Sequence, residues 1–461
     1  MQALHTRAAV SARFDDPNLV SHAGLVPVMR LAHDAGLGEL ADELVRLGES
    51  KGANAGAKIG SIVAGMVCGA DLIDDLDVIR HGALPELFGA IRAPSTLGTF
   101  LRHFSYGHVA QLEAVSAEVL TRLCRRCPQL LPGIDQLAFV DIDAKITEVY
   151  GPGKEGARFG YTGKRGLNFL IVTLSTPLSA PVLLATRLRG GNADSRRGAA
   201  SLLKRALRLA RACGATGTIV VRADSAFYTG PIIAAIRAAG ARFSITAQHN
   251  TSVTAAIQTI DAQTWTPITY PQALYDPDTD QWISAAEIAE TTYTAFTNVT
   301  ANPGRAATAR LVVRRVRIGT DTTDQGELFP VYRYHAVFTD SGFDLPTAEA
   351  QHRDHAIVEQ VLADLNDSAL AHLPSGRFAA NAAWLSLAAL THNLLRAAAT
   401  LASTTHAKAR TATIRRHLIN IAARISRSAR RTALHLPINW PWQHAWHGLF
   451  TATHAPPAQA S

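Results

Sequence analysis

Three aspartates in this sequence stand where a folded chain could gather carboxylates. Asp141 and Asp143 close the apolar run LAFVDID (137–143), and Asp224 directly follows the β-branched run TIVVRA (218–223). Both runs are typical of buried strands, and residues two apart on a strand share a face. Reactive groups in open α/β sheets gather at the carboxyl ends of strands, which is where we expect these acids to lie.

Carboxylates held close together repel one another, and the repulsion raises their pKa values unless a cation binds between them. Hard divalent cations would relieve it, because Mg²⁺ is held by few carboxylates and completed by water and substrate phosphate. We therefore predict two Mg²⁺ ions, for which Mn²⁺ would substitute, with Asp143, Asp224 and Asp141 as candidate ligands. Which of Asp141 and Asp143 is the principal first acid stays open, and each aspartate alone has the alternative role of capping a turn.

The hydrophobic pattern predicts the elements that carry these acids. Residues 131–247 give three strands, then a helix, a strand, a helix and a strand. The predicted strands are 137–143, 167–175, 180–189, 218–224 and 242–246, and the predicted helices are 195–214 and 230–240. This order predicts an α/β fold with a mixed sheet, and it is the order of an RNase H-like domain.

The rest of the chain falls into four further parts. Residues 1–130 have mostly helical spacing and are interpreted as a helical N-terminal region that binds DNA. Residues 248–350, with runs rich in Thr, Tyr and Val between turn residues, are predicted to form a β-rich insertion. Helical spacing returns over 351–400, where Glu359 lies off the centre of an apolar stripe, and 401–461 is predicted to be a basic helical C-terminal region.

Charge is distributed unevenly along the chain. Asp367 is the last acidic residue, so the final 94 residues carry ten Lys and Arg, whereas the first 367 carry 35 basic and 37 acidic residues. A helix over 409–436 would place four arginines on one face and apolar side chains opposite: Arg416, Arg424, Arg427 and Arg431. Arginines without interleaved acids repel one another, so we expect a DNA phosphate backbone on this face, with a solvated basic face as the alternative.

The segment PSTLGTFLRHF (94–104) has the apolar spacing of a helix, with Thr99 and Arg102 on its outer face. It is a candidate for the second helix of a helix-turn-helix, which would contact DNA bases through these two residues. An ordinary capped helix is the alternative.

Five blocks of sequence carry a resemblance to a known family. They are DIDAKITEVYGPGKEGARFGYTGKRGLNFLIV, LRGGNADS, VVRADSAF, HAIVEQVLADL and GRFAANAAWLSLAALTHNLLR. In this order they resemble bacterial insertion-sequence transposases of the DDE class, in the family called thirteen-eighty. The resemblance implies an RNase H-like catalytic core whose acids and metal ligands fall on Asp143, Asp224 and Glu359, with an all-β insertion between the second and third.

The resemblance also implies an activity and partners. Such a protein cuts DNA at the terminal inverted repeats of its own element and joins the 3′-OH ends to target DNA, and we expect it to act as a homodimer. The chain departs from the family's usual Tyr, Arg and Lys around the glutamate, because His352, His355 and Asn366 occupy those positions, and Lys145 stands where Thr is common. His352 and His355 are kept as candidate DNA contacts, although the departures bear on that role.

Composition limits the other classes. A chain of 461 residues with 47% apolar content can bury a packed core, and four cysteines cannot form a disulfide framework. No apolar run of about 18 residues and no signal-peptide pattern is present, so we expect a cytoplasmic, nucleoid-associated protein without a membrane partner. A structure-selective RNase H-like nuclease and a domesticated, non-catalytic DNA-binding protein are the alternative functions.

Overall fold

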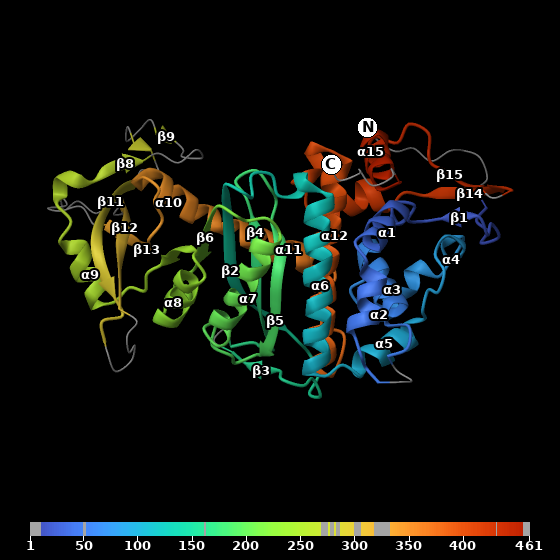
Figure 1. The fold of residues 1–461 in the computed structure, drawn as a ribbon, viewed down its shortest axis with the longest axis horizontal. Helices are drawn as coiled ribbons and strands as arrows, with labels where there is room; N and C mark the ends of the chain where they lie inside the picture. The colour runs from blue at the N-terminus through green and yellow to red at the C-terminus, as the bar shows by residue number, and fades with distance from the viewer. Residues whose placement is uncertain are drawn as a thin grey trace.

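A mixed sheet runs through the middle of the molecule (Figure 1), here described from a computed structural model. The described residues are 11–48, 52–160, 163–268, 275–276, 281–282, 286–298, 306–317, 332–429 and 431–454. The core of the sheet has the strand order β5–β4–β2–β6–β7, in which β2, β6 and β7 are parallel to one another while β4 and β5 run antiparallel to their neighbours. These strands are β2 (Leu137–Glu148), β4 (Arg165–Ser175), β5 (Val182–Gly190), β6 (Thr218–Ala223) and β7 (Arg242–Thr246), and the short β3 (Arg158–Phe159) pairs with β4. The predicted α/β class with an RNase H-like mixed sheet is confirmed.

The β-rich insertion continues the same sheet. β13 pairs antiparallel with β7, with Val337 opposite Thr246, and β12, β11 and β8 follow in order. The edge of β7 offers unpaired backbone groups, which β13 satisfies. The insertion contains α9 (Thr251–Gln258), β8 (Thr266–Ile268), β9 (Tyr275–Asp276), β10 (Gln281–Trp282), β11 (Ala286–Ala295), β12 (Ala307–Arg317) and β13 (Tyr332–Thr339).

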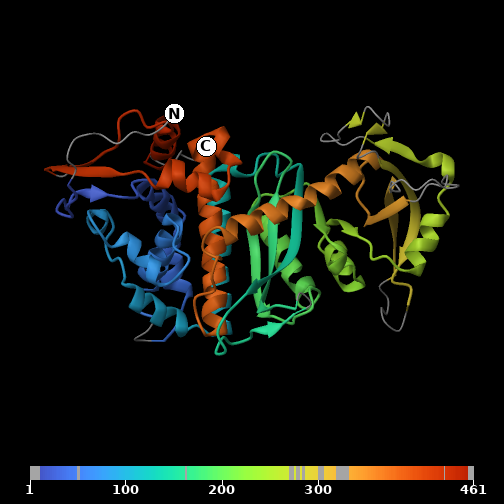
Figure 2. The same ribbon diagram turned by 180° about the vertical axis from the view of Figure 1, so that it is seen from behind.

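Helices cover both faces of the core sheet. α7 (Ala199–Ala212) and α8 (Gly230–Ala238) lie on the face toward the viewer in Figure 1, and α7 buries an apolar stripe that includes Leu203 and Leu207. α10 (Leu345–Arg353) and α11 (Ile357–Asn366) run across the opposite face, as Figure 2 shows. Within the described residues, no helix has the length and apolar character needed to cross a membrane.

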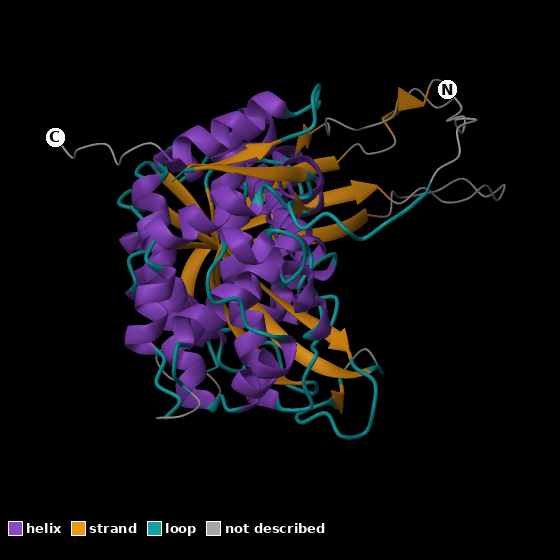
Figure 3. Cartoon of the chain, turned by 90° about the vertical axis from the view of Figure 1, so that its right-hand side faces the viewer, coloured by secondary structure: helices purple, strands orange, loops and turns teal. Residues whose placement is uncertain are grey.

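The helix α12 (Phe378–Ala402) joins the sheet to the N-terminal helices. Most of its 25 residues are buried, between β5 on one side and α1, α3, α5 and α6 on the other. Viewed from the N-terminal end, these helices stand in front of the sheet (Figure 3). The N-terminal helices are α1 (Leu25–Asp34), α2 (Leu37–Leu44), α3 (Ala55–Cys68), α4 (Leu84–Leu87), α5 (Pro94–Arg102) and α6 (Tyr106–Arg126).

The continuous helix predicted over 409–436 is wrong. The chain forms α13 (Thr404–Ala407), α14 (Thr411–Ile414) and a π-helical turn (Arg415–Ile419), then a hairpin of β14 (Ala423–Ser428) and β15 (Arg431–His435), then α15 (Gln443–His454). β14 pairs with β1 (Leu19–Val20), so a strand from the N-terminal region supplies its partner. In β14, buried Ala423 and Ile425 alternate with exposed Arg424. This alternation has the period of a strand, although the same apolar residues also fit the spacing of a helix. Arg424 and Arg427 therefore point to opposite faces of a strand.

The contact between α12 and β5 generates a test of the fold. The Asn393 side chain accepts a hydrogen bond from the Leu183 backbone N–H at 2.7 Å and donates one to the Leu183 carbonyl at 2.8 Å. Asn393→Ala should lower the free energy of unfolding by about 2–4 kcal/mol, because two buried backbone groups lose their partners. Thr400→Ala, whose hydroxyl only bonds its own helix, is the control and should cost under about 0.5 kcal/mol. Equal losses in denaturant titrations of both variants would contradict this role of Asn393.

Candidate active site

Two aspartates from neighbouring strands line one pocket. The parallel pairing of β2 and β6 ends with Ile142 opposite Ala223, so the next residues, Asp143 and Asp224, follow side by side on strands about 4.8 Å apart. Asp143 lies within β2, which runs on to Glu148 and is longer than predicted. Both acids line an open pocket of about 570 Å³.

Backbone hydrogen bonds orient the two carboxylates. Asp143 Oδ1 accepts from the Ala144 N–H at 2.6 Å, and Asp224 Oδ1 accepts from the Ala226 N–H at 3.0 Å, capping a short 3₁₀ turn. The capping role considered for a lone aspartate is therefore present at Asp224, together with its place in the pocket.

The third predicted acid, Glu359, lies on α11 with its side chain exposed. The pKa of Asp143 is raised to about 6, mainly by burial and also by the negative charges of Asp224 and Glu359, against the opposing effects of the Ala144 hydrogen bond and His355. Burial also raises the pKa of Asp224. Three distant segments of the chain thus bring their carboxylates close enough for each other's charge to matter.

Asp141 has a different environment from Asp143, although both lie on the same face of β2. It is fully buried and receives two hydrogen bonds from the Arg222 guanidinium, at 2.6 and 2.8 Å. His355 Nδ1 lies 3.1 Å from the same carboxylate. Burial alone would raise the pKa of Asp141, but the charge of Arg222 and the hydrogen bonds from His355 and Arg222 outweigh burial and lower it.

The two histidines near the glutamate are placed differently. His355 is close enough to Asp143 and Asp224 that its charge lowers the pKa of both. His352 is hydrogen-bonded through both ring nitrogens, to the Ser244 hydroxyl at 3.0 Å and the Thr246 hydroxyl at 2.9 Å. Burial lowers the pKa of His352 to about 3, so this ring is neutral and is already engaged by β7.

The turn after β5 completes the pocket, and sequence reasoning assigned it no role. Asn192, Asp194, Ser195 and Arg196 line the same pocket as Asp143 and Asp224. The first three of these residues belong to the block LRGGNADS (188–195), whose paired glycines were the available signal, and Arg196 follows it directly. A side chain at Gly191 would come within 2.1 Å of the Gly166 carbonyl oxygen, so only glycine fits.

Buried Arg189 fixes the conformation of this turn. Its Nη1 donates to the carbonyl oxygens of Asp194, Ser195 and Arg197 at 2.9, 3.0 and 3.1 Å. The hydrogen bond from Arg196 lowers the pKa of Asp194 to about 2, so this carboxylate stays ionised at the edge of the pocket. The turn therefore presents a fixed polar wall to any ligand.

The carboxylate oxygens near this pocket are the kind of ligand that hard divalent cations prefer. Asp143, Asp224 and Glu359 supply carboxylate oxygens, and the pKa of Asp143 is raised chiefly by burial and in smaller part by the charges of Asp224 and Glu359, which a cation would offset. Within the described part of the chain, no three His, Cys, Asp or Glu side chains are arranged closely enough to hold a metal ion. The three carboxylates come from separate segments of the chain and do not form a closed cluster.

The other predicted contacts lie away from these acids. Thr99 and Arg102 are exposed on α5, where Arg102 donates to the Thr99 hydroxyl at 3.1 Å. Arg424 pairs with Asp16 at 3.2 Å and Arg427 pairs with Glu86 at 2.6 Å. Exposed Arg416 and Arg431 have no ion pair with any described residue.

The family model described as "Transposase DDE domain group 1" matches residues 2–455 of the chain. No curated protein sequence matches it.

The contrast between Asp141 and Asp143 predicts opposite effects of one substitution. The folded-state pKa of Asp143, about 6, exceeds the unfolded value of about 3.9, so the protein loses stability as the pH rises between these values. Asp143→Asn removes this cost and should raise the free energy of unfolding by about 1–2 kcal/mol at pH 7, with no gain below pH of about 4.

Asp141→Asn is the matched comparison and should instead destabilise the protein by about 3 kcal/mol at pH 7, because it leaves the buried Arg222 charge unpaired. The lowered pKa of Asp141 makes this contribution present above about pH 4 and lost as the pH falls through the folded-state pKa. Denaturant titrations without divalent cations measure both values, and a shift of the same sign in the two variants would sink the distinction.

Proposed function

The chain belongs to the transposase DDE domain group 1 family, and from this premise we propose that it cuts DNA at the ends of its own insertion sequence and joins the freed 3′-OH ends to target DNA. The observation that supports this proposal most directly is the pocket that Asp143 and Asp224 share. Asp143 and Asp224 line one open pocket, and the charge of Glu359 from α11 acts on Asp143. The family match over nearly the whole chain favours a transposase over a nuclease built only from the sheet.

We assign metal binding to Asp143, Asp224 and Glu359. Two Mg²⁺ ions bound there would polarise the scissile phosphate and activate the attacking water or 3′-OH. The three acids would hold these ions against a pocket that is open to solvent, where a DNA strand can enter. The hydrogen bonds from Arg189 would keep the turn of residues 191–196 in one conformation, so that this wall of the pocket stays fixed.

Asp141 acts in this proposal as a positioning residue. It holds His355 through Nδ1 and is itself held by Arg222. Because Nδ1–H donates to Asp141, Nε2 is the nitrogen left for a substrate phosphate, and it donates a hydrogen bond to that phosphate in the doubly protonated, cationic form of the ring. His355 would then occupy the role of the arginine usual in the family, whereas His352 is not part of the proposed DNA contact.

We place the DNA-binding surface on two further parts of the chain. Arg416 and Arg431 would neutralise phosphates, and the β14–β15 hairpin has the two-stranded form that fits a major groove. Thr99 and Arg102 on α5 would contact bases, since phosphate contacts position a protein without selecting sequence. A homodimer bridging two element ends, in the cytoplasm with the nucleoid, completes the proposal.

Loss of either metal ligand tests the chemistry. Asp224→Asn and Glu359→Gln should each reduce cleavage of element-end DNA and strand transfer by at least about a thousandfold while DNA affinity changes by less than about twofold, because they remove ligands and not DNA contacts. Asp367→Asn changes an exposed acid at the end of the same helix and is the control. Cleavage with no strand transfer by the wild type would indicate a nuclease, and full activity in either variant would remove that residue from the site.

Salt dependence tests the basic surface. Arg416→Gln/Arg431→Gln should weaken binding to all DNA sequences alike and reduce the slope of log K against log salt by about 0.9 for each phosphate that the variant no longer neutralises. Arg424→Gln/Arg427→Gln removes the same charge from side chains that already pair with Asp16 and Glu86, so its effect should be smaller. An unchanged slope in the first variant would make these arginines solvated side chains.

A further inference from the structure

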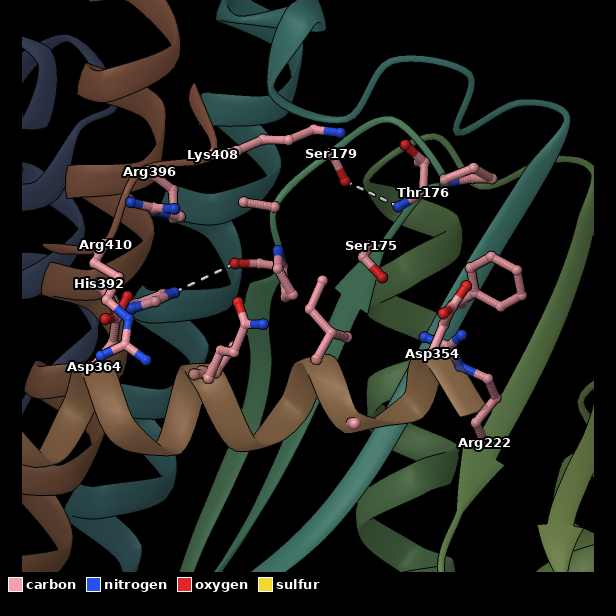
Figure 4. A pocket seen from close by; sticks show the side chains of 18 of the residues that line it. Ser175, Thr176, Ser179, Arg222, Asp354, Asp364, His392, Arg396, Lys408 and Arg410 are labelled. Atoms are coloured by element: carbon pink, nitrogen blue, oxygen red, sulfur yellow. Dashed lines mark hydrogen bonds between the residues drawn. The ribbon is translucent and has the colours of Figure 1, made fainter. Parts of the chain in front are cut away.

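A second pocket of about 560 Å³ lies between α11, α12 and the turn that follows β4 (Figure 4). Ser175, Thr176 and Ser179 come from that turn, and His392 and Arg396 come from α12. Lys408 and Arg410, both exposed, lie at its rim. None of these residues has a role in the proposed cleavage site.

The pocket lies on the side of α11 that faces away from Glu359. Ile357, Gln360 and Asp364 line it, and these positions share one face of α11. At about 100° per residue, Glu359 points to the nearly opposite face. A ligand in this pocket would therefore contact the helix that carries the third acid without touching the acid itself.

Two buried side chains in the pocket each have one nitrogen without a hydrogen-bond partner, although Arg396 Nη2 donates to the Ala409 carbonyl oxygen. Arg396 and His392 are each 4% exposed, and neither Arg396 Nε nor His392 Nδ1 has a hydrogen-bond partner. His392 Nε2 lies 3.3 Å from the Pro181 carbonyl oxygen, which can only accept, so Nε2 carries the proton and Nδ1 is an unsatisfied acceptor. Burial lowers the pKa of His392 to about 3 and keeps the ring neutral.

These two groups lie one turn apart on the same face of α12 and make complementary demands. Arg396 Nε–H requires an acceptor, and His392 Nδ1 requires a donor. Leaving such groups unsatisfied costs about 1–3 kcal/mol each. A single ligand that carries both an anionic oxygen and a hydroxyl would satisfy both.

The charge of the lining favours an anion. Five cations line the pocket, of which Arg222 pairs with Asp141 and Arg353 pairs with Glu349. The remaining Arg396, Lys408 and Arg410 outnumber the two carboxylates of the lining, Asp354 and Asp364. Arg396 has no ion pair within 4 Å among the described residues, and burial lowers its pKa only to about 10, so it remains a buried cation.

We propose that this pocket binds a phosphate group that carries a proton, either as inorganic phosphate or a free phosphate monoester or as the 5′-phosphate at a cut DNA end. A phosphate monoester has its second pKa near 6, so a protonated fraction persists at neutral pH. Its anionic oxygens accept from Arg396, Lys408 and Arg410, and its P–O–H donates to His392 Nδ1. A phosphodiester within a DNA strand has no such proton and fits less well.

Thermal unfolding of the full chain with inorganic phosphate tests the site, with sulfate at equal ionic strength as the anion that carries no proton at pH 6.5. Phosphate should raise the unfolding temperature above the sulfate value. In Lys408→Gln/Arg410→Gln, two exposed rim changes, the apparent affinity for phosphate should fall at least about tenfold. Lys204→Gln/Arg208→Gln removes the same charge from exposed positions on α7 and should behave as the wild type.

A second arm identifies the source of the phosphate. A 5′-phosphorylated oligonucleotide that binds at least about tenfold more tightly than its 5′-hydroxyl counterpart, with the preference lost in the rim variant, assigns the site to a DNA end. Phosphate binding without that preference assigns it to a free phosphate ester. If phosphate and sulfate act alike and the rim variant matches its control, water satisfies Arg396 and His392 and the proposal is wrong. These readouts need no cleavage, so they stand apart from any failure of the proposed function.

Discussion

The buried ion pair between Arg222 and Asp141 holds the candidate active site together. Arg222 lies on β6 two residues before Asp224, and Asp141 lies on β2 two residues before Asp143. Arg222 also donates to the Gln351 carbonyl oxygen at 2.7 Å, and Asp141 binds His355, four residues before Glu359. One guanidinium and one carboxylate thus connect all three segments that carry the acids. Because both charges are buried, removing either partner leaves the other unpaired and strongly lowers the free energy of unfolding. The pair therefore favours this arrangement of the three segments over others.

The charges of Asp143 and Asp224 oppose folding, because the pKa of each is raised in the folded chain. Asp143 has a raised pKa because it is partly buried and lies near two other negative charges. Such a cluster stores unfavourable energy that a divalent cation or an incoming cationic group would release. The two carboxylates on one face of β2 therefore differ in their surroundings: Asp141 is paired with Arg222 in the interior, and Asp143 lines the open pocket.

The remote parts of the chain are coupled to this site through packing. α12 lies against β5 of the sheet and against the N-terminal helices, and a single hydrophobic core runs through all of them. β1 from the N-terminal region pairs with β14 from the C-terminal region, and the hairpin arginines Arg424 and Arg427 pair with acids from residues 11–90. The N-terminal and C-terminal regions therefore share one hydrophobic core with the sheet, so DNA bound to either region would contact elements that pack against it.

The sequence alone determined the local elements and the type of chemistry. The strands around Asp143 and Asp224, the helix of Glu359 and the order of a mixed sheet follow from short-range periodicity, because alternation and helical spacing are properties of neighbouring residues. The strand over 423–428 was missed because Ala423, Ile425 and the arginines satisfy both periods, and only the partner strand at Leu19–Val20 decides between them. The N-terminal region and the tail are hundreds of residues apart, so no local pattern contains that pairing.

Tertiary structure alone decided the environment of each acid. Asp141 and Asp143 are equivalent in the sequence pattern, and they differ only because Arg222 and His355 close over the first while the second faces the pocket. The turn of residues 191–196 became part of the site because Arg189 folds it beside Asp143 and Asp224, and the unsatisfied Arg396 and His392 became visible only when α12 was packed behind α11. Burial and charge pairing depend on contacts between residues far apart in the chain, and these contacts separate residues that composition and spacing leave equal.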